Sequence, residues 1–271
     1  MLELNDATET PLVDLLSLAG RTAVVTGGAQ GLGKGIARRF AEAGANVVIG
    51  DRNLSAAQAA AADLSARYGA KVIAAALDVS DEQSVAGCAA TCLKQFRAID
   101  IWVNNAGVFP ALPISYMTLA DWEQVFAVNA RGTFLGAQAA SCAMAERGGV
   151  IINVASLAGI KGIAPALSAY VSSKHAVVGL TRQLAIELAP QRIRVLAIAP
   201  SFIVTEGNLA LMQSAPQTAE MAAEDIPSML QSKLGRVGVP DDIARVALFA
   251  ASDMALFMTG TTLVVDAGES A

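Results

Sequence analysis

Several features that mark whole classes of proteins are missing from this chain of 271 residues. It has only three cysteines, Cys88, Cys92 and Cys142, with no CxxC pair, and a single histidine, His175. A structural zinc site takes four Cys or His ligands, and a disulfide framework takes an even set of cysteines in a secreted chain. The sequence therefore predicts no metal site and no disulfides, and it favours free thiols in a reducing compartment.

Long apolar runs and clusters of positive charge are missing as well. The chain is 54% hydrophobic, but Gly, Asn, Asp or Thr breaks its apolar runs, and none approaches the roughly 20 residues of a membrane span. A net charge of -5 without a Lys/Arg-rich block argues against nucleic acid or an anionic membrane as partner. Residues 1–16 are acidic and lack Lys and Arg, the wrong charge for a secretory or mitochondrial leader. We expect a cytoplasmic protein.

The order of apolar runs predicts one α/β domain. No Pro/Ser/Gly-rich or charged linker divides the chain, and its length suits a single large core. Short β-branched runs alternate with Ala-rich helical stretches, which is typical of a parallel sheet covered on both faces. We predict a tail at 1–17 and a doubly wound, seven-stranded sheet within 18–271. The predicted strands are 22–26, 46–50, 71–77, 99–104, 150–155, 193–199 and 262–266, and the predicted helices are 31–43, 54–68, 81–96, 118–147, 168–188 and 241–251.

The segment 206–232 breaks this alternation, because Pro216 and Pro227 interrupt two short amphipathic stretches. Long loops beside a sheet are more often functional than not, so we interpret it as a substrate lid; a surface excursion without a role is the alternative. Residues 195–232 contain no Lys or Arg. Their large apolar residues include Phe202, Leu209, Leu211, Met212 and Met221. This composition suits a neutral, apolar substrate, although the same residues can serve only to pack the lid onto the core.

A glycine-rich turn, Thr26-Gly-Gly-Ala-Gln-Gly-Leu-Gly33, follows the first predicted strand and opens the first predicted helix. Its glycines allow a tight turn and bring the N–H groups and dipole of the helix N-terminus close to a pyrophosphate. Such a loop is weak evidence alone, and its position after a strand and before a helix strengthens it. The residues expected to hold a dinucleotide here are Gly27, Gln30, Gly31, Leu32 and Gly33.

Acidic residues end the next two predicted strands. Asp51 can accept hydrogen bonds from both ribose hydroxyls and would repel a 2′-phosphate, so NAD is favoured over NADP. Arg52 can pair with that phosphate and keeps NADP open. Asp78, followed by Val79, can accept from the adenine amino group or can simply form a turn. At the end of the fourth strand, Asn104-Asn105-Ala106-Gly107 has small side chains that let a cofactor lie against the backbone.

Tyr170-Val-Ser-Ser-Lys174 places a phenol and an ammonium four residues apart on one helix face. The ammonium favours the ionised phenol, which makes a tyrosine usable as an acid or base. Bringing a phenol from a pKa near 10 to about 7 requires roughly 4 kcal/mol. Tyr–Lys pairs also occur on ordinary helices, so the argument depends on the whole set of motifs.

That set resembles the short-chain dehydrogenase/reductases over residues 18–268. The matching elements are Thr26-Gly-x3-Gly-x-Gly33, Asp78, Asn104-Asn-Ala-Gly107, Asn129, Ser156, Tyr170-x3-Lys174, Pro200 with Thr205, and Thr259-Gly260 with Val265-Asp266. The resemblance implies a three-layer Rossmann fold and a nicotinamide cofactor. It also implies association into a homotetramer through the long helices and the last strand.

The resemblance further implies individual roles. Tyr170 would be the general base on an alcohol or the general acid on a ketone, and Lys174 would also bind the nicotinamide ribose. Ser156 would donate to the substrate oxygen, as an oxyanion-type stabiliser, and Asn129 would hold a water that relays the proton. After Pro200, Thr205 and the backbone of Ile203 would hold the nicotinamide carboxamide. The alternatives are a strand-end cap for Ser156 and an amide bonded to backbone for Asn129.

The chain departs from the family pattern in three places. Ser201 replaces a usual glycine, Ala267 replaces the first glycine of a usual Asp-Gly-Gly, and Ser156 and Tyr170 are 14 positions apart, one more than is common. The last departure suggests an extra residue between Gly159 and Ser168. None of the three removes a reacting group.

From these residues we predict an NAD-dependent oxidoreductase that interconverts a secondary alcohol, such as a polyol or a hydrophobic alcohol, and its ketone. One alternative is an NADP(H)-dependent enzyme like the 3-oxoacyl-(acyl carrier protein) reductases, disfavoured because Ile186 stands where those usually have an arginine. A non-catalytic NAD-binding subunit is the other. With one histidine and no GxSxG, a Ser-His-Asp hydrolase is disfavoured.

Overall fold

A computed structural model of the chain describes residues 7–206 and 232–271. They form a seven-stranded sheet in the order β3-β2-β1-β4-β5-β6-β7, in which each neighbouring pair is parallel. The strands are β1 (Thr22–Thr26), β2 (Asn46–Asp51), β3 (Val72–Ala76), β4 (Ile101–Asn104), β5 (Gly149–Val154), β6 (Ile193–Pro200) and β7 (Thr262–Val265). The order reverses between β1 and β4, and the carboxyl edge at such a reversal is where ligands bind in open α/β sheets.

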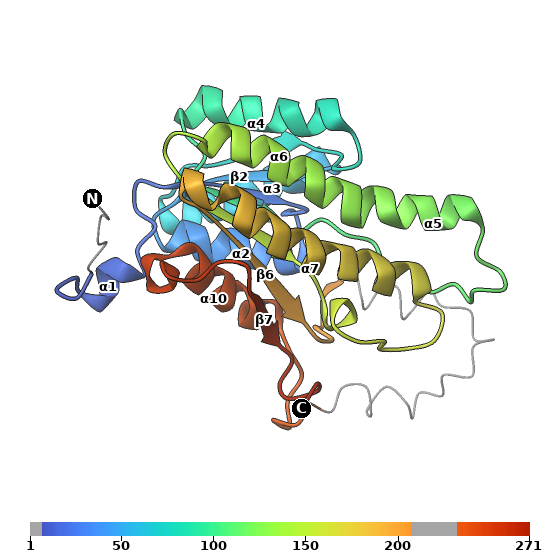
Figure 1. Cartoon of the computed structure of the whole chain (residues 1–271). Helices are drawn as coiled ribbons and strands as arrows, with labels where there is room; N and C mark the ends of the chain where they lie inside the picture. Colours follow the sequence, from blue (N-terminus) through green and yellow to red (C-terminus); the bar gives the residue numbers. More distant parts are fainter. Residues whose placement is uncertain (1–6, 207–231) are drawn as a thin grey trace.

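Helices cover both faces of the sheet (Figure 1). The longer ones are α2 (Gly31–Glu42), α3 (Leu54–Tyr68), α4 (Glu82–Phe96), α5 (Leu119–Phe126), α6 (Gly132–Met144), α7 (Ser168–Leu188) and α10 (Pro240–Ala251). Short ones are α1 (Leu12–Leu15), η1 (Ala127–Arg131), η2 (Leu157–Gly159), η3 (Ala189–Gln191) and η4 (Asp253–Ala255). One core cluster joins the sheet to α2, α3 and α10, and a second joins it to α4, α6 and α7. The layered α/β prediction is therefore confirmed.

The strands read as unbroken apolar runs because their residues are buried on both faces. All of β1 and β4 is buried, as expected for a parallel sheet between two helical layers. Two buried asparagines add a polar link: Asn104 Nδ2 donates to Asn153 Oδ1 at 2.9 Å, and Asn153 Nδ2 donates to Thr181 Oγ1 at 2.9 Å. These bonds tie the carboxyl ends of β4 and β5 to α7, the helix of the Tyr-Lys motif.

The predicted helix over 118–147 is found as α5, a π-helical turn and α6 in direct succession over 119–144 (Figure 1), so it ends three residues earlier than expected. Thr118 caps α5 through a reciprocal pair of bonds with Asp121, and residues 127–131 then form a π-helical turn before α6 begins. A π turn accommodates one extra residue and often marks a functional site. Here it contains Asn129. The helix ends at Met144, whose carbonyl accepts from the N–H of Gly148 at 2.8 Å.

The other predicted elements are found within two residues of their expected bounds, the short β3 and β4 included. No helix of the described ranges is long and apolar enough to span a membrane. Of the predicted lid at 206–232, only Glu206 and Ser232 lie within the described residues. Part of the predicted N-terminal tail is ordered as the single turn α1, and Leu18 N donates to Ala43 O at 2.8 Å.

Candidate active site

The glycine-rich turn lies between β1 and α2 and needs its glycines. Gly27 and Gly31 have φ of +63° and +54°, in the left-handed region that glycine adopts without steric cost. A Cβ on Gly27 would lie 2.9 Å from Ala106 Cα, and one on Gly33 would collide with the Gly27 carbonyl oxygen. No side chain caps α2 at Gln30, so the helix N-terminus keeps the N–H groups and dipole that favour an anion.

Thr26 and Asn105 lock the loop after β4 to this turn. The Thr26 hydroxyl accepts from the N–H groups of Asn105 and Ala106 at 2.9 and 3.0 Å. Asn105 Nδ2 donates to the carbonyls of Thr26 and Gly27 at 2.9 and 3.0 Å. Both amide protons of Asn105 are thus used inside the protein, so this residue shapes the crevice between β1 and β4. A Cβ on Gly107 would lie 3.3 Å from Asn129 Oδ1 and 3.6 Å from Lys174 Nζ, which brings this loop against the reacting residues.

Asp51 faces the glycine turn from the end of β2. Its Oδ2 accepts from Ala29 N at 3.1 Å, and its Oδ1 accepts from Asn53 N at 3.0 Å. The carboxylate is therefore fixed beside the helix N-terminus that suits a pyrophosphate, and its role toward a ribose stays a prediction.

Asp78 makes a turn in this structure. Its Oδ1 accepts from the backbone N–H and the hydroxyl of Ser80 at 2.9 and 2.6 Å. These bonds, with a weaker effect from Arg52, hold the pKa of Asp78 below its usual value. Val79 is buried, and a Cβ on Gly132 would lie 2.9 Å from its Cγ2. Asp78 and Val79 therefore link β3 to the start of α6.

The segment after β6 crosses the glycine turn. A Cβ on Gly31 would lie 3.5 Å from Cβ and Cγ2 of Thr205, so the structure brings these two residues close together. Ile203 is buried and bridges to Gly238. Ser201, which follows Pro200, is absent from the residues with positive φ. Replacement of the family's glycine at that position therefore causes no backbone strain.

Lys174 lies beneath the ring of Tyr170 on α7. Its Nζ is 5.8 Å from the ring centroid and donates to the Val154 carbonyl at 2.8 Å. Burial lowers the pKa of Lys174 to about 8. Burial also raises the pKa of Tyr170, with the Ser156 hydroxyl opposing it. The raised pKa of Tyr170 thus reflects burial of the phenol, and the expected lowering of this pKa by the charge of Lys174 stays a prediction.

Ser156 follows β5 and is buried. Its Oγ accepts from the N–H of Ala158 at 3.1 Å, which caps η2. A hydroxyl has one proton and two lone pairs, so this bond fixes the oxygen and leaves its proton to donate elsewhere. The capping alternative is thus observed, and it is compatible with a role as a donor.

Asn129 connects the loop after β4 to α7. Its Oδ1 accepts from Val108 N at 2.8 Å, and its Nδ2 donates to Val108 O at 2.8 Å and to Ser173 Oγ at 3.0 Å. Ser173 Oγ donates in turn to the Tyr170 carbonyl at 2.8 Å. Both amide protons of Asn129 are used inside the protein. Val108 and Ser173 were not predicted as site residues from the sequence, although Ser173 directly precedes Lys174 and is likewise buried.

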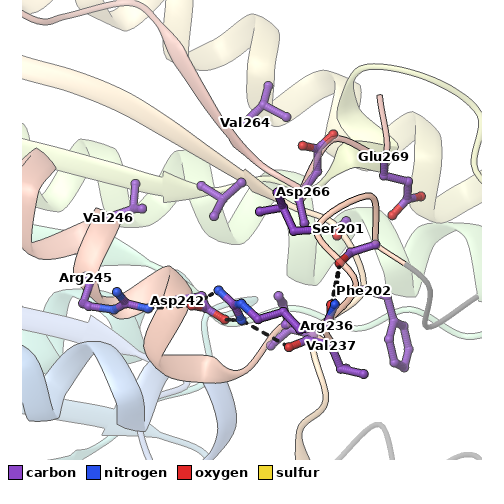
Figure 2. A pocket seen from close by; sticks show the side chains of 16 residues that line it. Ser201, Phe202, Arg236, Val237, Asp242, Arg245, Val246, Val264, Asp266 and Glu269 are labelled. Carbon is purple, nitrogen blue, oxygen red and sulfur yellow. Dashed lines mark hydrogen bonds and ion pairs between the residues drawn. The ribbon is translucent and has the colours of Figure 1, made fainter. Parts of the chain in front are cut away.

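A pocket of about 400 Å³ lies beyond the carboxyl ends of β6 and β7. Figure 2 shows the side chains that line it. Asp242 lies between Arg236 and Arg245 on its wall, with N–O distances of 2.6 Å to each, and Arg236 lowers the pKa of Asp242 to about 2. None of Asn129, Ser156, Tyr170 and Lys174 lines this pocket. It is therefore a neighbour of the candidate site rather than its centre.

The described residues contain no group of three or more His, Cys, Asp or Glu arranged to hold a metal ion. Cys88 and Cys92 are buried, and burial raises the pKa of each to about 12. Both thiols are therefore kept in the protonated form that neither ligates metals nor attacks electrophiles readily.

A doubly wound sheet with a glycine turn at its switch point, beside a Tyr-Lys pair and a buried serine, defines an oxidoreductase with a Rossmann-type fold. Comparison with known proteins gives the family. The model of a family described as Enoyl-(Acyl carrier protein) reductase matches residues 27–270. The chain belongs to the short-chain dehydrogenase/reductase family, whose members bind a nicotinamide cofactor.

Characterised relatives differ in their substrates. The chain is 40% identical over 257 residues to 3beta-hydroxysteroid dehydrogenase 2 from Eggerthella lenta, covering 94% of this chain and 96% of that one. It is 37% identical over 252 residues to a 3-oxoacyl-(acyl-carrier-protein) reductase from Chlamydia trachomatis, covering 93% and 98%. Among solved structures, a 7 alpha-hydroxysteroid dehydrogenase complexed with NADH and 7-oxo glycochenodeoxycholic acid has a TM-score of 0.87 and 33% identity, with 94% and 96% covered.

Proposed function

We propose that this protein is an NAD-dependent dehydrogenase that oxidises a neutral, apolar secondary alcohol, or reduces the matching ketone. The observation that carries this proposal is the arrangement of Tyr170, Lys174 and Ser156 around one point. Lys174 is buried 5.8 Å from the Tyr170 ring, and Ser156 is close enough to influence the phenol pKa. These are the groups that acid–base chemistry on a C–O bond requires.

The proton would move between the substrate oxygen and the Tyr170 phenol. In oxidation the phenolate accepts the hydroxyl proton; in reduction the phenol donates it. The Ser156 hydroxyl, whose oxygen is fixed by Ala158 N, would donate to the same oxygen as it gains negative charge. The protonated Lys174 favours the phenolate through its charge. Bound NAD would supply the hydride acceptor, and NADH the donor.

The cofactor crevice supports NAD. Gly27, Gln30, Gly31, Leu32 and Gly33 would face the pyrophosphate, where an added Cβ on Gly27 or Gly33 would fill the crevice. Asp51 would accept from the ribose hydroxyls, and its charge disfavours a 2′-phosphate. Asp78, Val79 and the backbone of Asn105, Ala106 and Gly107 would line the adenosine side, and Ile203 with Thr205 would hold the carboxamide.

Asn129 would contribute mainly by holding neighbouring groups in place. Because both of its amide protons bind Val108 and Ser173, we propose that a relay water is held through an acceptor oxygen of Asn129 rather than through its amide protons. The backbone carbonyl of Asn129, which accepts from Thr133 Oγ1 at 2.7 Å, is the oxygen that we propose for such a water.

A 3-oxoacyl-(acyl carrier protein) reductase that uses NADPH is the second candidate, supported by relatives with that name. An acidic carrier protein needs a basic docking surface. Ile186, where those reductases usually have an arginine, is 72% exposed and apolar. Arg52 is the observation that favours NADP, since it is exposed beside Asp51 and can pair with a 2′-phosphate. We place this candidate second because this chain lacks the arginine that would dock the carrier protein.

We also propose a cytoplasmic homotetramer. Leu119, Phe134 and Ile186 are large apolar side chains, each at least 45% exposed, on α5, α6 and α7. Apolar positions of this kind on long helices suit symmetric association across a two-fold axis. Light scattering on the purified protein measures the mass directly, and a monomeric mass would contradict the proposal.

Tyr170→Phe tests the function. We expect kcat for any accepted alcohol to fall at least 100-fold while the Kd of NADH stays within about 2-fold, because only the reacting proton is removed. Tyr116→Phe, on an exposed loop residue, is the matched control and should behave like the parent. The panel contains secondary alcohols, polyols, ketones and a 3-oxoacyl thioester, each with NAD(H) and NADP(H). Thioester turnover with NADPH alone would favour the second candidate, and NADH binding without any turnover would favour a non-catalytic subunit.

A further inference from the structure

Phe109 lies against the reacting tyrosine and has no part in the chemistry described above. The centroids of the Phe109 and Tyr170 rings are 6.0 Å apart, with an interplanar angle of 63°. This is an edge-to-face contact, the arrangement that aromatic pairs prefer. The Phe109 side chain is nevertheless 41% exposed. A large apolar ring is therefore partly open to solvent directly beside the site of proton transfer.

The backbone around Phe109 is fixed on both sides. The preceding residue, Val108, is held through its N–H and its carbonyl by Asn129 at 2.8 Å each. Further along the loop, the N–H of Leu112 donates to the carbonyl of Ala166 at 2.8 Å. Ala166 has φ of +64°, a left-handed conformation that costs a non-glycine residue about 1 kcal/mol. The ring of Phe109 is thus carried on a pre-positioned loop, as a wall that selects by shape requires.

The second loop beside the site is also apolar at its surface. Ile160 and Ile163, on the segment between Ser156 and Tyr170, are 43% and 39% exposed. The one cation of that segment, Lys161, donates to the carbonyl of Glu269 at 3.1 Å. This segment, which leads from Ser156 into the helix of Tyr170, therefore offers apolar side chains and a lysine that already has a partner, which disfavours a charged substrate.

We propose that Phe109 is a substrate-selecting residue: its ring forms a wall that favours a ketone or alcohol on a rigid, fused apolar ring system over the same group on a small single ring. The proposal rests on the function proposed above. A fused ring system presents a large flat face that Phe109 can cover without loss of internal freedom, whereas a small single ring offers the Phe109 ring much less area. The contact should then contribute far more to the binding of large substrates than of small ones.

Calorimetric titration of the protein loaded with NAD, which cannot reduce a ketone, with 2-tetralone and with cyclohexanone tests this proposal. For Phe109→Ala we expect the Kd of 2-tetralone to rise about 10-fold and the Kd of cyclohexanone to change less than about 2-fold. Phe109→Leu keeps apolar bulk but not the flat ring, and it should give an intermediate Kd. Tyr116→Ala is the matched control, an aromatic residue of the same loop that is 79% exposed, and it should leave both values unchanged.

The outcomes separate this inference from the proposed function. An equal effect of Phe109→Ala on both ketones, an equal effect of Tyr116→Ala, or no binding of 2-tetralone by the parent would overturn the inference. Turnover of both ketones without Phe109-dependent selectivity leaves the proposed function standing and removes the inference. Phe109-dependent binding of 2-tetralone without turnover with either cofactor leaves the inference standing and contradicts the proposed function. If the alanine variant is poorly folded, the Phe109→Leu variant still tests the inference.

Discussion

The side chain of Asn129 pairs with the backbone of Val108 as a neighbouring strand would, accepting from its N–H and donating to its carbonyl at 2.8 Å each. The same amide donates to Ser173 on the helix of Tyr170. One buried side chain therefore fixes the loop that carries Phe109 relative to the helix that carries the reacting phenol. This explains why a polar residue is buried inside a helix, at its π turn.

Asn129→Asp should break this arrangement with almost no change in volume. The carboxylate cannot donate, so Val108 O and Ser173 lose their donor and face a negative oxygen instead. We expect the free energy of unfolding to fall by about 2–3 kcal/mol and kcat to fall with it, measured by urea denaturation and initial rates. Asn53→Asp is the control, since Asn53 caps α3 from the surface and aspartate caps equally well. Unchanged stability of the Asn129 variant would contradict the structural role.

Lys174 makes stability depend on pH. Its pKa is lowered from 10.5 to about 8 in the folded protein, so between these values the unfolded chain binds more protons and stability rises with pH. Below pH 8 the buried charge costs about 3 kcal/mol. Relative to Lys174→Met, the cofactor-free parent should therefore gain about 2 kcal/mol between pH 7.5 and 10.

Urea denaturation of parent and variant at the two pH values measures this gain, because other titrating groups cancel in the comparison. Lys94→Met, at an exposed position of α4, should differ from the parent by the same amount at both pH values. A difference between parent and Lys174→Met that stays constant with pH would show that the folded lysine titrates normally.

Asp51 should set the preference between the two nicotinamide cofactors. Asp51→Ala removes the acceptor for the ribose hydroxyls and the charge that repels a 2′-phosphate. We expect the Kd of NADH to rise about 10-fold or more and the Kd of NADPH to stay equal or fall, measured by NAD(P)H fluorescence titration. Asp63→Ala, at an exposed position on α3, is the charge-matched control. Retained NADH affinity in the Asp51 variant would contradict the assignment.

Ala267 carries backbone strain that a glycine would relieve. Its φ is +50°, and the family usually has glycine at this position. Ala267→Gly should raise the free energy of unfolding by up to about 1 kcal/mol. Ala59→Gly, at an exposed position inside α3, should lower it by about 1 kcal/mol. Both variants replace alanine by glycine, and their changes in the free energy of unfolding should have opposite signs in the same denaturation assay. Destabilisation by both would refute the strain argument.

The sheet and much of the cofactor crevice were predictable because their signals are local. Buried parallel strands are continuous β-branched runs, and Gly27, Gly31 and Gly33 occur where φ or a close approach demands glycine. The spacing of Tyr170 and Lys174 alone places both on one helix face.

Other features depend on contacts between distant residues. The π turn at residues 127–131 contains Asn129, whose side chain bonds to Val108 and Ser173 on other elements, and no local pattern encodes these bonds. The pKa of Tyr170 depends on how deeply the phenol is buried, and a helical wheel drawn from the sequence does not show this burial. Phe109 meets Tyr170 only after two loops are joined by the Leu112–Ala166 bond.

The reversal of strand order between β1 and β4 separates the part of the molecule that forms the site from the part that stabilises the fold. The crevice exists because the chain winds in opposite directions from these two strands, whatever side chains line it. The two apolar clusters that stabilise the sheet contain none of Ser156, Tyr170, Lys174 and Phe109. An exchange of the loops at the carboxyl edge can therefore adapt the site to another molecule while the layers beneath stay intact. In this architecture, specificity can change in evolution while the stability of the fold is kept.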